Sequence, residues 1–168
     1  MGIEFKVISE TDISRLAEIF YSCLHHDYQG VLPPNIIESF SDESSTELWR
    51  NSYYNQTLLH FLGAWDGDLL VGFAKYGADS EDPLNGYIAS LYVDPDQAGQ
   101  GIGSALLNYV LKELSSYPMT RLWVFDQNPR AIGLYEKLGF IRSGRTRTEA
   151  QWEAVSYTHL TLPTKRIV

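Results

Sequence analysis

The sequence has little cysteine, no long apolar run and no recognisable export signal. Cys23 is the only cysteine among 168 residues, so no disulfide forms within the chain and no cysteine-based zinc cluster can be built. No apolar run approaches the roughly 20 residues that span a bilayer, and residues 1–9 lack the charged and then apolar pattern of a secretory signal. These absences predict a cytoplasmic protein that does not insert into membranes.

Positive charge is also scarce. Lys and Arg total 13 against 21 Asp and Glu, which gives a net charge of −8 at pH 7. An acidic chain repels phosphate backbones and anionic lipids, and the sequence contains no basic patch. We therefore expect no nucleic-acid or membrane-surface partner and favour a cationic one, such as an amine. A chain of this length with 44% apolar residues is typical of one globular domain.

Two periodicities divide the chain into helices and strands. Alternating apolar and polar residues are typical of half-buried strands, whereas apolar residues at three- and four-residue steps are typical of helices. In chain order these patterns predict a strand over 3–7, a helix over 13–24, a helix opened by Ser44 and Glu47, a hairpin over 58–76 around Asp66-Gly67, a strand over 87–93, a helix with apolar residues at 106–114, a strand over 121–125, and a helix that begins at Asn128-Pro129 and ends at Gly139. The order predicts an α/β fold with a mixed sheet.

The last residues call for a separate interpretation. Residues 155–160 read Val-Ser-Tyr-Thr-His-Leu, which resembles a read-through translation of the transposon-end adapter used in DNA sequencing libraries. On this interpretation the natural domain covers residues 1–154, residues 155–168 are a foreign tail, and the C-terminal strand is truncated. The alternative is an ordinary C-terminal strand.

A glycine-rich segment carries the strongest chemical signal. Residues 97–104 read Gln-Ala-Gly-Gln-Gly-Ile-Gly-Ser and lie between a predicted strand end and a predicted helix. Such a loop brings several backbone N–H groups close to a ligand at a helix N-terminus, which suits a pyrophosphate. A Walker loop is excluded because no Gly-Lys-Ser/Thr follows, and the dinucleotide fingerprint fails because Ser104 or Leu106 stands at its third small position. The alternative is a glycine-rich turn that only starts a helix.

Two motifs together resemble the GCN5-related N-acetyltransferase (GNAT) family. The glycine segment resembles the family's motif A, and the Leu-Tyr-Val-Asp-Pro sequence of residues 91–95 precedes it as the family's strand does. Residues 128–140, Asn-Pro-Arg-Ala-Ile-Gly-Leu-Tyr-Glu-Lys-Leu-Gly-Phe, are similar to motif B at the usual distance. The segment Tyr28-x-Gly30-x-Leu32-Pro33 also looks like a loop of many members. The resemblance runs from about residue 3 to residue 147.

This resemblance implies an acetyl-CoA-dependent N-acetyltransferase without a metal, in which an amine attacks the thioester directly. The cofactor would occupy a cleft where two central strands splay apart, and Tyr135 would be the general acid that protonates the departing thiolate. The residues implied to contact the cofactor are Leu91, Tyr92, Val93, Ala98, Gly99, Gln100, Gly101, Ile102, Gly103, Ser104, Asn128 and Tyr135. The acceptor would be an amine-bearing small molecule or protein. Both a monomer and a homodimer are compatible with the resemblance.

The chain departs from the family pattern at two positions. Ala98 replaces the usual Gln or Arg, which removes a side-chain contact near the phosphates but keeps the backbone N–H groups. Tyr87 stands where many members have a glutamate base, which leaves Glu81, Asp82 or a water chain as candidates. The two departures together motivate a rival interpretation as a non-catalytic acyl-CoA-binding module.

Several candidate residues also have structural explanations. Periodicity alone makes Tyr135 a core residue, and Asn128 is explained by a helix N-cap role. Adjacent histidines point apart on a helix, so His25 and His26 are expected to be solvated rather than to bind a metal. The aromatic residues Trp49, Tyr53 and Tyr54 either line an acceptor pocket or belong to core and surface.

Overall fold

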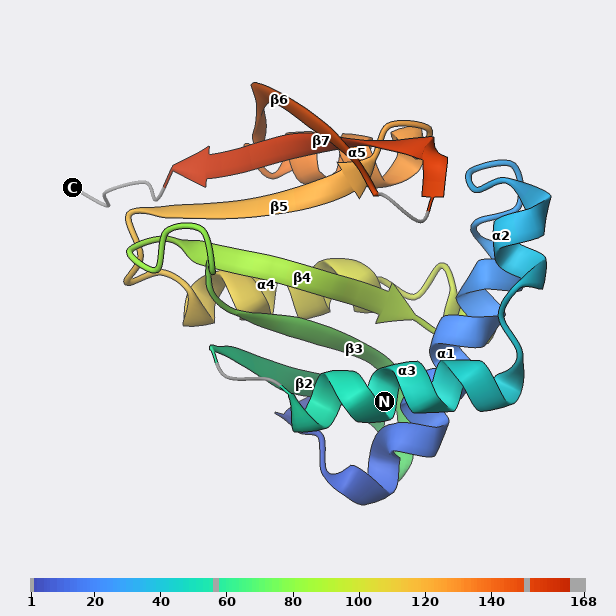
Figure 1. Ribbon diagram of the computed structural model, residues 1–168. Coiled ribbons are helices and arrows are strands. Elements are labelled where there is room, and N and C mark those ends of the chain that lie inside the picture. Colours follow the sequence, from blue (N-terminus) through green and yellow to red (C-terminus); the bar gives the residue numbers. More distant parts are fainter. Residues whose placement is uncertain (1, 56–57, 150–151, 164–168) are drawn as a thin grey trace.

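A seven-stranded mixed sheet with helices on both faces forms the molecule (Figure 1). The computed structural model describes residues 2–55, 58–149 and 152–163. The strand order across the sheet is β1-β2-β3-β4-β5-β7-β6. The strands are β1 Ile3–Val7, β2 Leu59–Asp66, β3 Leu69–Ala78, β4 Gly86–Val93, β5 Met119–Phe125, β6 Ile141–Glu149 and β7 Trp152–Pro163. The helices are α1 Ile13–His26, α2 Pro34–Glu38, α3 Asp42–Tyr54, α4 Ile102–Glu113 and α5 Pro129–Lys137, with short 3-10 turns at Glu10–Asp12 and Pro95–Gln97.

The structure confirms the predicted α/β class and most of the predicted elements. The hairpin forms as β2 and β3, and Gly67 in its turn has a φ of 62°, the left-handed conformation that an Asp-Gly turn supplies. Helix α3 begins earlier than predicted. Its N-cap is Ser41, whose side chain accepts from the Ser44 N–H at 3.0 Å, while the Ser44 Oγ accepts from the Ser41 N–H at 2.8 Å. The prediction that Ser44 and Glu47 form the capping box is therefore wrong, because Ser44 already lies in the first turn of the helix.

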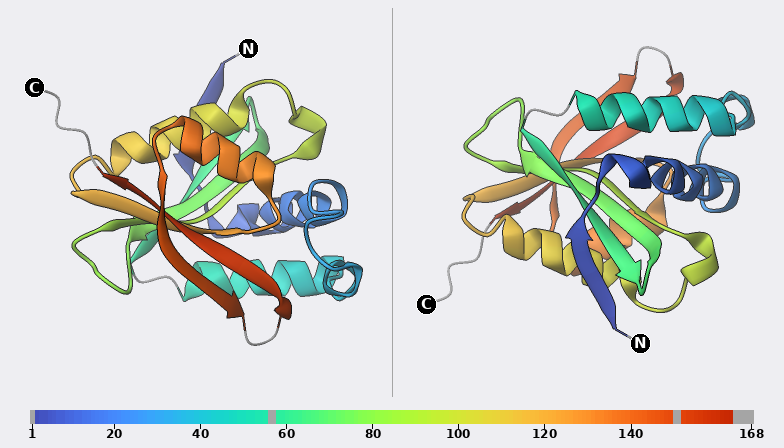
Figure 2. Two further views of the ribbon diagram at one scale, coloured as in Figure 1. Left: turned by 90° about the horizontal axis from the view of Figure 1, so that it is seen from above. Right: turned by 90° about the horizontal axis from the view of Figure 1, so that it is seen from below.

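Each face of the sheet carries its own hydrophobic core. Helices α1 and α3 cover one face and α4 and α5 cover the other, as the two views of Figure 2 show. The first core is rich in aromatic rings: Phe20 packs edge-on against Trp49 at 5.3 Å and against Tyr92 at 5.4 Å between ring centroids. The second core is mostly aliphatic and includes the buried face of α4. Strand β4 thus presents side chains to both cores.

The middle of the sheet is only partly closed. Strands β4 and β5 run parallel and pair only through residues 86–88 with 120–122, although both strands continue further. A bulge helps to redirect β4: Lys75 pairs with Ser90 and Tyr76 with Ile88, which leaves Ala89 as the extra residue. The predicted splay of two central strands is confirmed.

The C-terminal residues complete the sheet. Strand β7 pairs antiparallel with β5 from Met119↔Pro163 to Phe125↔Tyr157 and also pairs with β6. Leu160 is fully buried, and Tyr157 and His159 are buried on the opposite face. This segment therefore fills the place between β5 and β6, and the truncation of the natural strand stays a prediction. The adapter origin of residues 155–168 stays a prediction, since a strand's position does not reveal the source of its codons.

No helix within the described residues is long and apolar enough to cross a membrane.

Candidate functional site

A cavity of about 560 Å³, here called the cofactor groove, opens where β4 and β5 separate. Its walls are the second half of β4, the glycine-rich loop with the start of α4, the N-terminus of α5 and the end of α1. Every residue implied to contact the cofactor lines this groove except Gln100. The Gln100 amide instead donates to the Gln97 Oε1 at 3.3 Å on the surface. The structure thus gathers the predicted set around one space.

The glycine-rich loop has the backbone geometry of an anion site. Gly99 and Gly101 have φ values of 82° and 76°, and Gly101 is the N-cap of α4. A Cβ at either glycine would meet no atom within 4 Å, so backbone conformation rather than crowding requires glycine there. The first N–H groups of α4 have no partners within the helix, and Ile102, Gly103 and Ser104, which carry them, line the groove. This loop therefore fits a pyrophosphate.

Within the part of the chain that the structure describes, the edge of β4 beyond Ile88 that faces the groove pairs with no other strand. The pairing of β4 with β5 ends at Ile88, so the peptide groups that follow on this edge are accessible to an extended ligand, as at the edge of a sheet. The Cys23 thiol donates to the Val93 carbonyl at 3.2 Å from α1. Burial raises the pKa of Cys23 well above its usual value, with Asp27 adding to the rise, so the thiol stays protonated. Cys23 is therefore no nucleophile.

Helix α5 brings Asn128 and Tyr135 to the groove. The Asn128 side chain caps α5 by accepting from the Ala131 N–H at 3.2 Å, and the residue also lines the groove. Tyr135 packs edge-on against Phe140 at 5.4 Å, and its side chain belongs to the core as periodicity predicts. Burial raises the pKa of Tyr135 to about 12. Its hydroxyl is therefore protonated at neutral pH and can donate a proton.

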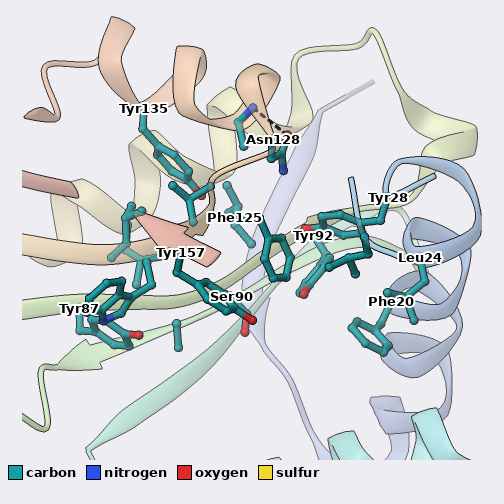
Figure 3. Close-up of a pocket in the computed structure, with 18 of the residues that line it drawn as sticks. Phe20, Leu24, Tyr28, Tyr87, Ser90, Tyr92, Phe125, Asn128, Tyr135 and Tyr157 are labelled. Carbon is teal, nitrogen blue, oxygen red and sulfur yellow. Dashed lines mark hydrogen bonds between the residues drawn. The ribbon is translucent and has the colours of Figure 1, made fainter. Parts of the chain in front are cut away.

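A second cavity of about 270 Å³, here called the acceptor cavity, continues from the groove (Figure 3). Aromatic side chains from α1, the following loop, β4, β5 and β7 surround it. Six residues line both spaces: Tyr28, Leu91, Tyr92, Asn128, Ala131 and Tyr135. The two spaces therefore meet beside the Tyr135 ring.

Three tyrosines gather where the spaces meet. Burial raises the pKa of Tyr28 well above its usual value, and neighbouring Tyr92 and Tyr135 add to the rise. The Tyr28 and Tyr92 rings pack edge-on with their centroids 6.3 Å apart, and burial raises the pKa of Tyr92 as well. The Tyr28 ring packs edge-on against Phe125 with centroids 5.6 Å apart. All three hydroxyls are neutral near pH 7, which makes the junction polar but uncharged.

The candidate bases lie elsewhere. Glu81 accepts from both Nη atoms of Arg145, at 3.1 and 3.0 Å, and this hydrogen bond lowers its pKa. Asp82 accepts from the Leu84 N–H and the Asn85 amide in a turn. Neither carboxylate is among the residues that line the two cavities. Tyr87 does line the acceptor cavity, in the place where many members of the family have glutamate.

Other candidates also lie outside both cavities. His25 is exposed and packs on Tyr21, and His26 is exposed beside Asp27. Trp49 is in the first core, where Tyr53 packs against it, and Tyr54 is exposed with its hydroxyl bound to Glu10. The described residues contain no group of three or more His, Cys, Asp or Glu that could hold a metal ion.

The sequence patterns did not point to two arginines at the site. Arg130, in the first turn of α5, lines the cofactor groove together with the glycine-rich loop. Arg147, on β6, lines the acceptor cavity. The position of Arg130 directly after Asn128-Pro129 in motif B was the available signal. Nothing local marks Arg147, since only the sheet topology brings β6 to this side.

Comparisons with known proteins agree with this geometry. A model of the acetyltransferase (GNAT) family matches residues 14–140. A probable N-acetyltransferase of Mycobacterium tuberculosis is 29% identical over 165 residues, which cover 95% of this chain and 91% of that protein. A probable spermine N(1)-acetyltransferase of Bacillus subtilis subsp. natto is 33% identical over 100 residues, 55% of this chain and 62% of that protein.

A solved structure extends the agreement to the whole fold. The crystal structure of the PaiA N-acetyltransferase of Thermoplasma acidophilum in complex with coenzyme A has a TM-score of 0.74 and 24% identity, covering 97% of this chain and 99% of that one. Because the family model spans more than half of its length, the chain belongs to the acetyltransferase (GNAT) family. It is an N-acetyltransferase, and the resemblance carried by motifs A and B is confirmed.

Proposed function

We propose that the protein transfers the acetyl group of acetyl-CoA to a primary amine. The observation that carries this proposal is that the cofactor groove and the acceptor cavity meet at Tyr135. When bound, acetyl-CoA supplies an activated acetyl thioester. The glycine-rich loop would hold its pyrophosphate through backbone N–H groups, and the Arg130 guanidinium, which lines the same groove, would add a positive charge.

The open edge of β4 fits the remainder of the cofactor. Peptide groups over residues 89–93 would hydrogen-bond an extended chain of amides in place of the missing pairing with β5. The same backbone N–H groups would polarise the acetyl carbonyl, since donors fixed in a water-poor groove stabilise a developing oxyanion. A protein of the same fold has been solved in complex with coenzyme A, which supports coenzyme A as a ligand of this fold.

Deprotonation of the amine need not involve a carboxylate base. The described residues that line the acceptor cavity contain no Asp, Glu or His, and they are mostly aromatic. Transfer of an ammonium into such surroundings disfavours the charged form and lowers its pKa. The neutral amine then forms a nitrogen–carbon bond as the carbon–sulfur bond breaks. One proton leaves the nitrogen for solvent, and one passes from the Tyr135 hydroxyl to the thiolate, with solvent reprotonating the tyrosine.

Calorimetry and turnover test the proposal together. We expect acetyl-CoA to bind and NAD and ATP not to bind, with thiol release that depends on an added amine. Binding without turnover over a broad amine panel would favour the non-catalytic acyl-CoA module. Lack of acetyl-CoA binding would contradict both interpretations.

A further inference from the structure

Asp94 joins the two parts of the cofactor groove that the proposed function uses. It directly follows the open edge of β4 over residues 89–93 and precedes the glycine-rich loop over residues 97–104. The residue is buried, and it lines the groove. A buried carboxylate therefore lies just before the loop that would hold a pyrophosphate. Two anions in such a place repel each other unless a positive charge compensates one of them.

Arg15 of α1 supplies that positive charge. Its Nη2 donates to the Asp94 Oδ2 at 2.6 Å, in an ion pair whose side chains are 30% and 9% exposed. Its Nε donates to the Leu70 carbonyl at 3.0 Å, which fixes the guanidinium at the start of β3. The exposed Glu18 lies 3.8 Å from its Nη1 and is the weaker contact, because solvent screens it. These contacts hold α1 against the end of β4, where Figure 1 shows the two elements side by side.

The remaining polar atoms of Asp94 shape the turn that leads into the glycine-rich loop. Its Oδ1 accepts from the Asp96 N–H at 3.0 Å, and its backbone carbonyl accepts from the Gln97 N–H at 2.8 Å. Its own N–H donates to the Val71 carbonyl at 2.8 Å. One carboxylate thus caps the 3-10 turn with one oxygen and binds Arg15 with the other. A change at Arg15 therefore reaches the glycine-rich loop through a single side chain.

We propose that Arg15 is a positioning residue for the cofactor, which neutralises Asp94 and holds its carboxylate in the orientation that caps the turn before the glycine-rich loop. This inference rests on the proposed binding of acetyl-CoA and adds a residue that does not itself line the groove. Without the guanidinium, the carboxylate would repel a pyrophosphate in the loop and would be free to rotate away from the Asp96 N–H.

Calorimetry with two acetyl donors tests this role. Acetyl-CoA carries the pyrophosphate, whereas S-acetylpantetheine has the same thioester and amides without any phosphate. The dissociation constants of both would be measured for the full chain, for Arg15→Met, for Arg15→Lys, and for Arg15→Met combined with Asp94→Asn. Arg121→Met is the matched control, because Arg121 forms a similarly close ion pair with the buried Asp79, at 2.7 Å, and neither residue lines the groove. Urea unfolding would measure the stability of each variant separately.

We expect Arg15→Met to weaken acetyl-CoA binding about 10- to 100-fold, because an uncompensated charge in a partly buried place is poorly screened. Binding of S-acetylpantetheine should change less than about threefold, since this donor carries no phosphate. Arg15→Lys keeps the positive charge and should bind acetyl-CoA within about fivefold of the full chain. The double variant should regain most of the lost affinity, because asparagine is uncharged and its Oδ1 still accepts from the Asp96 N–H. Arg121→Met should lower stability but keep acetyl-CoA affinity within about threefold.

Three results would overturn the inference. The first is an Arg15→Met variant that binds acetyl-CoA within about threefold of the full chain. The second is an equal loss of affinity for both donors, which would indicate a general structural role, and the third is a double variant that binds acetyl-CoA no better than Arg15→Met.

These measurements need no amine, so they are separate from the transfer reaction. Absence of thiol release with every amine, with the expected binding series intact, would refute the proposed transfer alone. Lack of acetyl-CoA binding by the unsubstituted chain would refute the cofactor site on which both proposals rest.

Discussion

Replacement of Tyr135 by phenylalanine is the sharpest test of the proposed chemistry. The substitution removes only the hydroxyl and keeps the ring that packs edge-on against Phe140 at 5.4 Å. General acid catalysis contributes about 10²- to 10⁴-fold, so we expect kcat to fall by that factor. Burial raises the pKa of Tyr135 to about 12, and burial beside the same groove raises the pKa of Cys23 well above its usual value. Burial would raise the pKa of the departing thiol in this groove for the same reason. The pKa values of the proton donor, Tyr135, and of the proton acceptor, the thiolate, would then differ less.

The assay is thiol release over a range of pH, with calorimetry of acetyl-CoA as the control. Cys23 is buried and should not react with the thiol reagent on the assay timescale. We expect Tyr135→Phe to bind acetyl-CoA within about threefold of the full chain, since the ring and the groove are retained. A kcat within about threefold of the unsubstituted protein, with binding intact, would refute the role of Tyr135 as the acid.

Four further measurements test the structure. Gly101→Ala should destabilise the fold by about 1–2 kcal/mol in urea unfolding and weaken acetyl-CoA binding, because φ is 76° there, and Gly101→Asn should cost less. Gly133→Ala should stabilise the fold by about 0.5–1 kcal/mol in the same assay, because the site in α5 is helical and a Cβ meets nothing within 4 Å. Asp79→Asn should cost about 2 kcal/mol in urea, since it removes the nearer partner charge of the partly buried Arg121 and leaves it Glu81 at 3.9 Å, and a loss below about 0.5 kcal/mol would contradict this. Burial raises the pKa of Tyr135, so the stability that its neutral form contributes is complete below about pH 10 and is lost as the pH rises toward 12. Urea titrations at pH 9 and 11 should therefore show a smaller loss of stability with pH for Tyr135→Phe than for the unsubstituted protein.

Local signals made the cofactor groove predictable from the sequence. The loop at Gly99 and Gly101 needs left-handed backbone, which few residues other than glycine adopt readily, so the glycines mark it directly. Asn128 and Gly139 mark the two ends of α5, because a cap is decided by neighbouring residues. The start of α3 was misjudged since Ser41 and Ser44 both offer capping oxygens three residues apart, and local spacing does not rank them.

Long-range topology made the acceptor cavity unpredictable. Tyr28, Tyr87 and Phe125 line the cavity although they are far apart in the chain. The pairing of β5 with β7 determines which side chains of these two strands face the cavity. Strand β6 was not predicted because it lies at an edge of the sheet and its residues 141–148 are exposed, which leaves no apolar alternation to read. Arg147 is one of several arginines on that strand, and only its contacts distinguish it.

The short seam between β4 and β5 has a mechanical consequence. Three residue pairs, at 86–88 and 120–122, join two parts of the sheet that each contain well-paired strands. The place where the sheet opens with the fewest broken ladder bonds therefore lies next to the cofactor groove, where acetyl-CoA would bind under the proposed function. A molecule bound along the seam would touch both parts and resist their separation. The rate of product release and the stiffness of the whole sheet would then be set by the same few backbone contacts.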